Sequence, residues 1–275
     1  MKERLISVIL IFLLLTPLSA PAGLKDTIEP SKSIEKGVSN DILFLGNSYT
    51  SQNNLASKLN ELMDSGGEDV SVSALTGGGL NLKDHEEKAR DTGDSWNLAL
   101  NEANDYVILQ DQSQIPSFPT SSTSWRESKA GAIYLNERIW NSNGNTILFM
   151  TWGYKDGDSN NQWRNPDYLT MQLHLRQGYE MYLENITTDS QPAFIAPVGL
   201  AFEYIYNNVA DTGVDPSVDS TSFSNLYSSD GSHPSIDGTY LAACVFHSIL
   251  TGNSTIGLDY PNQISPSRAL ELQQA

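Results

Sequence analysis

The segment Ile42-Leu43-Phe44-Leu45-Gly46-Asn47-Ser48-Tyr49-Thr50 joins an apolar run to a Gly-Asn-Ser turn. Four consecutive apolar side chains before a glycine predict a short strand that is buried on both faces, as in a parallel sheet. A helix is predicted to begin soon after the turn, near Asn53 or Asn54. The order of strand, turn and helix indicates an α/β fold and places Ser48 where the strand ends.

The same alternation of apolar runs and helical segments continues along the chain. The apolar runs lie at residues 42–45, 70–75, 106–109, 146–151 and 193–198. Helices are predicted at residues 54–65, 96–103, 126–140, 167–183, 200–208 and 235–250. This alternation predicts a three-layer α/β/α sandwich with a five-stranded parallel sheet. Functional loops are then expected at the carboxyl ends of the strands.

The first 22 residues have the features of a signal peptide. A basic start with Lys2 and Arg4 precedes an apolar run at residues 5–15, and the segment ends in Ala20-Pro21-Ala22. The run is shorter than the roughly 20 apolar residues that span a bilayer. We expect a cleaved signal peptide at 1–22, a flexible lead-in at 23–40 and a single domain at 41–275. The alternative is an uncleaved membrane anchor.

This organisation predicts an exported protein in the periplasm, at the cell surface or in the medium, with no membrane contact after cleavage. The net charge is −17, from 16 basic and 33 acidic residues, and argues against nucleic acid and anionic membrane surfaces as partners. Cys244 is the single cysteine, so no intramolecular disulfide forms, and its apolar surroundings predict a buried side chain. The oligomeric state is left open.

Two distant segments supply the side chains of a serine hydrolase. Ser48 follows a strand, and Asp230-Gly231-Ser232-His233-Pro234 lies near the other end of the chain. A serine hydroxyl needs an adjacent base to become a nucleophile, and an imidazole oriented by a carboxylate is the usual activator. In Asp-x-x-His both side chains lie on one turn. The alternative is that Ser48 or Thr50 caps a helix, while Asp230 caps a turn that leaves His233 at the surface.

These blocks resemble the SGNH hydrolase superfamily, also called GDSL-type esterases and lipases. Gly46-Asn47-Ser48 is similar to its first block, with asparagine where many members have aspartate, and the Asp230–His233 segment is similar to its last block. The resemblance implies a flavodoxin-like sheet, with Ser48 as nucleophile, His233 as general base and acid, and Asp230 as the residue that orients the imidazole.

The resemblance also implies an oxyanion hole made by the amide of Ser48, a glycine and an amide side chain. The glycine is expected at Gly77 or Gly78, after the second strand. Where the superfamily has Gly-x-Asn-Asp after the third strand, this chain has Gln110-Asp111-Gln112-Ser113-Gln114. A glutamine amide donates the same hydrogen bond, so either Gln112 or Gln114 is expected to complete the hole.

Several aromatic residues follow the strands, and they suit a carbohydrate-binding rim as well as plain packing. They are Trp125, Trp152, Tyr154 and Trp163, of which Trp152 is expected to line the pocket. His85 lies among acidic residues on a stretch that reads as a solvated face, so no metal site is expected. No cofactor is expected either.

The sequence therefore predicts an exported serine ester hydrolase that works through an acyl-enzyme, with an acetylated carbohydrate or similar small acyl ester as substrate. Two alternatives remain. One is a lipase, thioesterase or broad-range esterase with the same site. The other is a glycan-binding or interaction module that has the fold without the activity.

Overall fold

The computed structural model describes residues 40–188 and 190–275. The predicted signal peptide and the lead-in up to residue 39 lie outside the described residues. The first strand begins at Asn40, one residue before the predicted start of the domain. Among the residues described, none of the helices is long and apolar enough to cross a bilayer.

The centre of the molecule is a five-stranded parallel sheet, as predicted. Its strands are β1 (Asn40–Gly46), β2 (Val70–Thr76), β3 (Tyr106–Leu109), β4 (Asn145–Phe149) and β5 (Ala193–Ala196). They are arranged in the order β2-β1-β3-β4-β5, and each neighbouring pair is parallel. The chain crosses from β1 to β2 on one side and then from β2 to β3 on the other side of β1. This reversal makes the carboxyl end of β1 a topological switch point.

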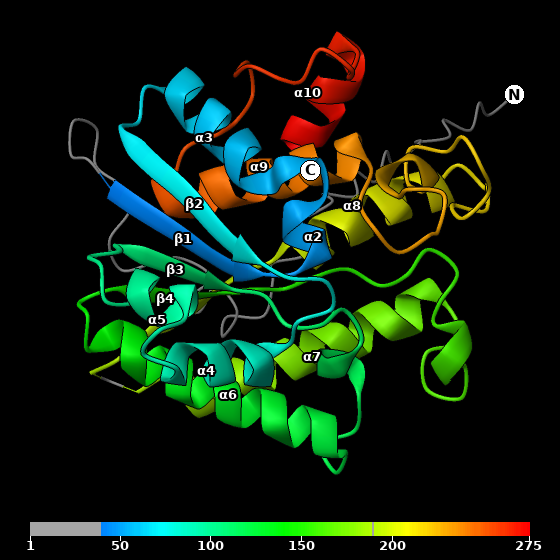
Figure 1. The fold of residues 1–275 in the computed structure, drawn as a ribbon. Helices are drawn as coiled ribbons and strands as arrows, with labels where there is room; N and C mark the ends of the chain where they lie inside the picture. Colours follow the sequence, from blue (N-terminus) through cyan, green and yellow to red (C-terminus); the bar gives the residue numbers. More distant parts are fainter. Residues whose placement is uncertain (1–39, 189) are drawn as a thin grey trace, which may run out of the picture.

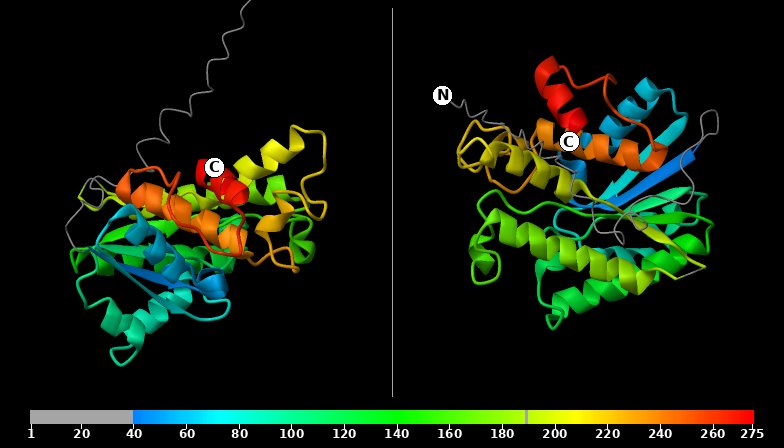
Figure 2. Two further views of the ribbon diagram at one scale, coloured as in Figure 1. Left: turned by 90° about the horizontal axis from the view of Figure 1, so that it is seen from above. Right: turned by 180° about the vertical axis from the view of Figure 1, so that it is seen from behind.

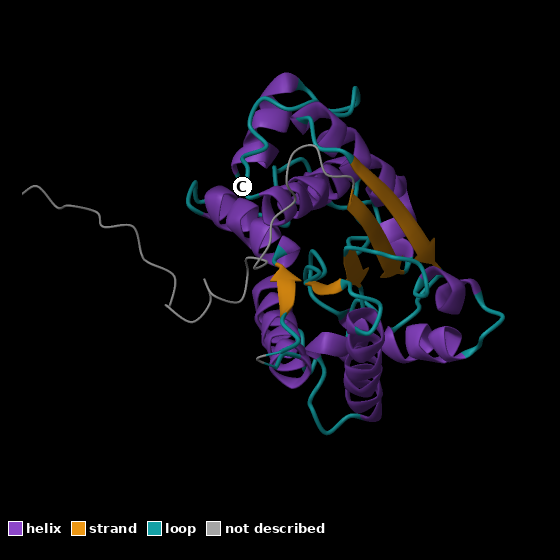
Figure 3. Ribbon diagram, turned by 90° about the vertical axis from the view of Figure 1, so that its left-hand side faces the viewer, coloured by secondary structure: helices purple, strands orange, loops and turns teal. Residues whose placement is uncertain are grey.

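Helices cover both faces of the sheet (Figures 1 and 2). One layer contains α3 (Leu55–Gly66), α8 (Val198–Ala210), α9 (Ile236–Thr251) and α10 (Pro266–Gln274). The opposite layer contains α4 (Leu82–Arg90), α5 (Ser95–Ala99), α6 (Thr123–Trp140) and α7 (Tyr168–Ile186). Figure 3 shows the strands between the two layers, so the three-layer α/β/α architecture is confirmed.

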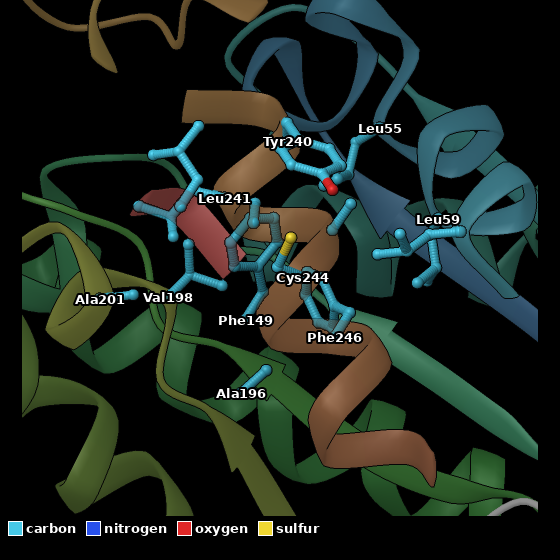
Figure 4. Close-up of a cluster of buried hydrophobic side chains, with 14 of the residues drawn as sticks. Leu55, Leu59, Phe149, Ala196, Val198, Ala201, Tyr240, Leu241, Cys244 and Phe246 are labelled. Carbon is cyan, nitrogen blue, oxygen red and sulfur yellow. The ribbon is translucent and has the colours of Figure 1, made fainter. Parts of the chain in front are cut away.

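Each face of the sheet has its own hydrophobic core. Ile42 and Phe44 of β1 belong to the cluster beneath α3, α8 and α9, whereas Leu43 and Leu45 belong to the cluster beneath α4 to α7. Figure 4 shows the first cluster, in which Cys244 of α9 lies among apolar side chains. Cys244 is buried, as predicted, and burial raises the pKa of its thiol to about 12.

Several elements differ from the sequence prediction; α10 (Pro266–Gln274), for example, was not predicted. Strand β2 is an edge strand in which only Val70 is buried, because one side has no neighbouring strand. Helix α4 was not predicted, because most of its residues are charged. Its buried residues are Leu82, His85 and Ala89, which form a narrow stripe against the rest of the protein. A capping box between Asn81 and Asp84 begins this helix.

Short helical turns complete the loops at the carboxyl end of the sheet. They are α2 (Ser48–Ser51), η1 (Gln52–Asn54), η2 (Ile115–Ser117), η3 (Ser159–Asn161) and η4 (Ser224–Leu226). Figure 1 shows α2 directly beyond the arrowhead of β1. The predicted site residues lie on these loops.

Candidate active site

Ser48 is the first residue of a helical turn that begins immediately after β1. Its neighbour Asn47 caps this turn, and the Asn47 Oδ1 atom accepts a hydrogen bond from the amide of Tyr49 at 3.1 Å. The amides of Thr50 and Ser51 donate to the Asn47 carbonyl at 3.0 Å. This short turn, α2, precedes α3, which begins at Leu55 close to the predicted position, and the half-buried Ser48 hydroxyl stands at the carboxyl edge of the sheet.

The structure brings Ser48, His233 and Asp230 together in one chain of hydrogen bonds. The Nε2 atom of His233 lies 2.9 Å from the Ser48 Oγ atom, although 185 positions separate the two residues. On the other side of the ring, Nδ1 lies 2.6 Å from Asp230 Oδ2. Because a carboxylate only accepts, Nδ1 carries the proton and Nε2 is free to accept the hydrogen of the Ser48 hydroxyl.

Asp230 is held ionised by its own turn. Its Oδ1 atom accepts hydrogen bonds from the amides of Ser232 and His233, each at 2.9 Å. Partial burial raises the pKa of Asp230, but these two amides and the His233 imidazole outweigh it, so the net pKa lies below the ordinary value. The carboxylate therefore stays charged and orients the ring at neutral pH.

The segment from Ser228 to His233, here called the histidine turn, closes on itself through local bonds. Ser228 donates its amide to the His233 carbonyl at 2.8 Å, and Gly231 donates to the Ser228 carbonyl at 3.0 Å. Gly231 has a φ of 68°, in the left-handed region that favours glycine. Lys155 adds one distant contact, from its amide to the Gly231 carbonyl at 2.8 Å.

Residues after the nucleophile attach this turn to the sheet, and the sequence analysis did not identify them. Asn53 donates from Nδ2 to the Pro234 carbonyl at 3.1 Å and to Thr239 Oγ1 at 3.0 Å. Gln52 donates to Ser228 Oγ at 3.0 Å. Asn53 has a φ of 55°, a conformation that asparagine tolerates, and the sequence offers only that weak signal. These contacts fix the distance between nucleophile and base.

A cavity of about 260 Å³ opens beside these groups. It is lined by Asn47, Ser48, Tyr49, Gly79, Gln112, Ser113, Tyr154, Ser232 and His233. Its wall contains hydroxyl, amide and imidazole groups and no aliphatic side chain. The cavity therefore has the composition of a polar binding site beside the nucleophile.

Comparison with solved structures finds proteins of similar fold. The chain is similar to a protein of Slackia heliotrinireducens assigned as an SGNH hydrolase, with 25% identity and a TM-score of 0.58 over 77% of this chain and 99% of that chain. It is also similar to a DUF4886 family protein of Bacteroides uniformis, at 18% identity and a TM-score of 0.68, over 86% and 93% of the two chains.

A third similar structure is the acetyl xylan esterase AlAXEase, with 13% identity and a TM-score of 0.54, over 76% of this chain and 98% of that chain. No family model matches the chain, and no curated protein matches it. The chain has the fold of the SGNH hydrolase superfamily.

The glycine beside the cavity is not one of the two that were predicted for the oxyanion hole. Gly79 lines the cavity, whereas Gly77 and Gly78 do not. The Gly77 amide donates to the Gly46 carbonyl at 3.4 Å, which continues the pairing of β1 with β2. Among the described residues, the amides of Ser48 and Gly79 have no protein acceptor, so both are available to a developing oxyanion.

The two glutamines predicted for the hole have different surroundings. Gln112 lines the cavity, and its Nε2 atom has only long contacts, 3.3 Å to Gln114 Oε1 and 3.4 Å to Ser113 Oγ. Gln114 turns away and donates to the buried carboxylate of Asp158 at 2.8 Å. The geometry therefore favours Gln112 as the side-chain donor.

Gln110 has a different task, which the sequence analysis did not identify. Its Oε1 atom accepts from the Asn47 amide at 3.1 Å and from Thr50 Oγ1 at 2.7 Å, and its Nε2 atom donates to Asn47 Oδ1 at 2.5 Å. The side chain is fully buried. Gln110 therefore holds Asn47 and Thr50, which lie on either side of Ser48, through hydrogen bonds. One of its partners is the neutral side-chain amide of Asn47.

Asp111 lies beneath the same loop and accepts four hydrogen bonds. Its Oδ1 atom accepts from the amides of Leu82 and Gln112 at 3.1 and 2.8 Å and from Ser128 Oγ at 3.0 Å, while Oδ2 accepts from the Tyr182 hydroxyl at 3.0 Å. Burial raises the pKa of Asp111 to about 6 despite these donors. Asp111 joins the loop after β3 to the starts and faces of three helices.

Trp152 does not line the cavity, contrary to the prediction. It is fully buried between Tyr49 and Phe202, with ring centroids 4.7 and 4.3 Å away and nearly parallel planes. Its Nε1 atom donates to the Ser232 carbonyl at 3.1 Å. Trp152 therefore supports the histidine turn from behind, because its apolar ring is more stable in the core than at a polar wall.

The other aromatic residues divide in the same way. Tyr154 lines the cavity, Trp125 is buried in α6, and Trp163 is exposed on the loop after β4.

His85 is also buried, contrary to the prediction of a solvated face. It accepts a hydrogen bond from Trp96 Nε1 at 3.0 Å, and burial lowers its pKa to about 4, so it is neutral. Within the described residues, no group of three potential metal ligands occurs.

Proposed function

We propose that this SGNH hydrolase is an exported serine ester hydrolase that removes a small acyl group, such as acetate, from a carbohydrate or similar alcohol. The proposal rests chiefly on one observation: Ser48 Oγ lies 2.9 Å from an imidazole nitrogen whose ring is held by Asp230 at 2.6 Å. This geometry suits general-base activation of a serine hydroxyl.

The reaction begins with attack of Ser48 Oγ on the ester carbonyl, while His233 Nε2 takes the hydroxyl proton. The amides of Ser48 and Gly79 and the Gln112 side chain hold the negative oxygen of the tetrahedral intermediate. The carbon–oxygen bond to the alcohol then breaks, and His233 returns the proton to the leaving oxygen. Water, deprotonated by His233, hydrolyses the acyl-enzyme and releases the carboxylic acid.

The cavity supports a short acyl group over a long chain. Its volume of about 260 Å³ is small, and its lining combines polar groups with the rings of Tyr49 and Tyr154 and has no aliphatic side chain. A long hydrocarbon chain needs an extended apolar surface to gain hydrophobic stabilisation, and a cavity of this size accommodates only a short one. A lipase or long-chain thioesterase is therefore the less favoured use of the same catalytic groups.

The first experiment is covalent labelling with a fluorophosphonate probe, together with turnover of aryl acetate. Wild-type protein should label and hydrolyse the ester, Ser48→Ala should do neither, and His233→Ala should lose turnover by about 10³-fold or more. Ser267→Ala, at an exposed position on α10, is the matched control and should behave as wild type. A folded wild-type protein that neither labels nor hydrolyses acetate contradicts the proposal and favours the non-catalytic module.

Acyl-chain length is tested with aryl esters from acetate to octanoate. The proposal expects kcat/KM to fall as the chain lengthens. A rise toward octanoate would instead support a lipase.

Export is tested by the intact mass of the protein recovered outside the cytoplasm. This protein should begin near Gly23. A full-length protein retained in the membrane would support the uncleaved anchor.

A further inference from the structure

The amide side chain of Gln112, the oxyanion donor in the mechanism above, is oriented by its neighbours in the loop after β3. Its Oε1 atom accepts a hydrogen bond from the backbone amide of Gln114 at 2.8 Å. A backbone N–H only donates, so this bond identifies the oxygen of the Gln112 amide and leaves Nε2 on the other side. Gln112 also donates its own backbone amide to Asp111 Oδ1 at 2.8 Å. The direction of Nε2 then depends on a further partner.

Gln114 supplies that partner, and Asp158 decides which way the Gln114 amide points. The Gln114 Nε2 atom donates to Asp158 Oδ2 at 2.8 Å. Because a carboxylate only accepts, Gln114 keeps its nitrogen toward Asp158 and its oxygen toward Gln112. That oxygen accepts from Gln112 Nε2 at 3.3 Å. The three side chains form one chain of hydrogen bonds, here called the amide chain, whose direction is set by Asp158.

The amide chain uses one of the two hydrogens on Gln112 Nε2. The remaining contact of this atom, 3.4 Å to Ser113 Oγ, is at the outer limit of a hydrogen bond. Gln112 lines the cavity beside Ser48, so the second hydrogen is available to an oxyanion that forms there.

Asp158 is 1% exposed and accepts four hydrogen bonds. Its Oδ1 atom accepts from the amides of Asn160 and Asn161 at 3.0 and 3.3 Å, which caps η3. Its Oδ2 atom accepts from Gln114 and, at 2.7 Å, from Asn161 Nδ2. Capping needs only Oδ1, an atom that asparagine also has. The second carboxylate oxygen is the part of Asp158 that sets the direction of Gln114.

The segment that carries Asp158 is anchored beside η2 by separate contacts. Arg164 donates from Nε to the Ser117 carbonyl at 2.9 Å, and the fully buried Asn165 donates from Nδ2 to Ser117 Oγ at 2.8 Å. The Asp158 amide donates to the Asn165 carbonyl at 2.9 Å. Because these bonds place the segment without the bond from Gln114 to Asp158, that bond can be altered while the segment stays in position.

We propose that Asp158 is a positioning residue for the oxyanion hole, which acts through Gln114 to hold Gln112 Nε2 as a donor toward the cavity. This inference rests on the proposed function, in which Gln112 binds the oxyanion. A donor that is already oriented stabilises the transition state without a rearrangement at the moment of reaction. Asp158 and Gln114 touch no reacting atom, so their effect on turnover passes entirely through Gln112.

The first test is Asp158→Asn. The new residue keeps Oδ1 for the cap and presents Nδ2 to Gln114, so Gln114 turns its oxygen to Asn and its nitrogen to Gln112, where two donors then meet. For aryl acetate, kcat should fall by about 10–100-fold while KM changes by less than about twofold. Asp211→Asn, at an exposed position that ends α8, is the matched control and should behave as wild type.

A swapped pair tests the direction of the amide chain. In the double variant Asp158→Asn with Gln114→Glu, the amide and the carboxylate exchange places. The glutamate then accepts from Asn on one side and from Gln112 Nε2 on the other, so kcat should return to within about fivefold of wild type. A folded double variant that stays as impaired as Asp158→Asn overturns the inference.

A second background separates positioning from a general structural role. In Gln112→Ala the oxyanion donor is already absent, so adding Asp158→Asn should change kcat by less than about twofold. The affinity for phenylboronic acid, which forms a tetrahedral adduct with a catalytic serine, should fall in Asp158→Asn by about the same factor as kcat. Equal losses of kcat with and without Gln112 would show that Asp158 acts through the loop as a whole, and would overturn the inference.

Wild-type turnover distinguishes this inference from the proposed function. If wild type hydrolyses aryl acetate and Asp158→Asn does so equally well, the proposed function stands and the inference is wrong. If folded wild type neither labels with fluorophosphonate nor hydrolyses the ester, the proposed function is contradicted, and the inference is overturned with it.

Discussion

The loop after β3 and the histidine turn both position catalytic groups, but by opposite physical means. Gln110 and Asp111 are fully buried, and besides contacts with adjacent residues their side chains bond to groups 17 to 71 positions away in sequence. Asp230 is about half-exposed, and its side chain bonds only to residues two and three positions away. The two side chains of the first region are held largely by buried long-range bonds, whereas the Asp230 side chain is held by its own turn.

The comparison shows that a carboxylate's role follows from its surroundings. At Asp111, burial outweighs four hydrogen-bond donors and raises the pKa to about 6. At Asp230, backbone amides and the imidazole outweigh partial burial, and the pKa is lowered. The buried carboxylate organises the loops, while the exposed one stays charged and controls the imidazole. Three predictions test this division.

The largest difference in kcat is expected between two single variants, Asp230→Asn and Asp111→Asn. In Asp230→Asn the new amide faces Nδ1, so the imidazole takes the wrong tautomer, and kcat should fall by about 10³–10⁴-fold with little change in stability. In Asp111→Asn, Oδ1 keeps its three donors and the amide donates to the Tyr182 hydroxyl, so kcat should stay within about tenfold. Steady-state kinetics and chemical denaturation of both variants decide this. Similar losses of activity at both positions would remove the distinction.

The adjacent glutamines sharpen the comparison within one loop. Gln112→Ala removes the cavity-facing donor and should lower kcat by about 10²–10³-fold at unchanged stability. Gln110→Ala leaves the Asn47 amide and the Thr50 hydroxyl without acceptors and should lower the unfolding free energy by about 2–4 kcal/mol. Urea titration and kinetics separate the two outcomes. If Gln112→Ala lowered the unfolding free energy and Gln110→Ala did not, the roles assigned to the two glutamines would be reversed.

The pH dependence of stability should have opposite signs at the two carboxylates. Because the folded pKa of Asp111 is raised from 3.8 to about 6, the folded state holds its proton more tightly, and this contribution is lost as pH rises from about 4 to 6, by roughly 3 kcal/mol. The pKa of Asp230 is lowered in the folded state, so its ionised form stabilises the fold at pH values above its ordinary pKa. This contribution is lost as pH falls through the folded pKa.

Denaturation from pH 4 to 7 checks this prediction. The stability of wild type relative to Asp111→Asn should decline across the interval, whereas its stability relative to Asp230→Asn should stay nearly constant. A flat difference for Asp111→Asn would mean that its hydrogen bonds, and not burial, dominate the carboxylate.

The sequence predicted those parts of the fold that depend on local pattern. Buried runs such as residues 106–109 mark strands with little ambiguity, since both faces of a parallel sheet are covered. Helix α4 was missed because three buried residues among charged neighbours give a weak period, and its burial depends on packing against α6. Strand β2 proved mostly exposed because edge position is a property of the whole sheet.

The sequence by itself determined the parallel sheet, the position of Ser48 at the end of a strand, and the pairing of Asp230 with His233, because each depends on residues a few positions apart. Only the tertiary structure decided that Gly79 and Gln112 face the cavity, that Gln110 clamps the nucleophile turn, and that Trp152 is packed behind the histidine turn. Those outcomes depend on contacts between segments 30 to 185 positions apart, where burial and competition for hydrogen-bond partners choose among residues that look equivalent in sequence.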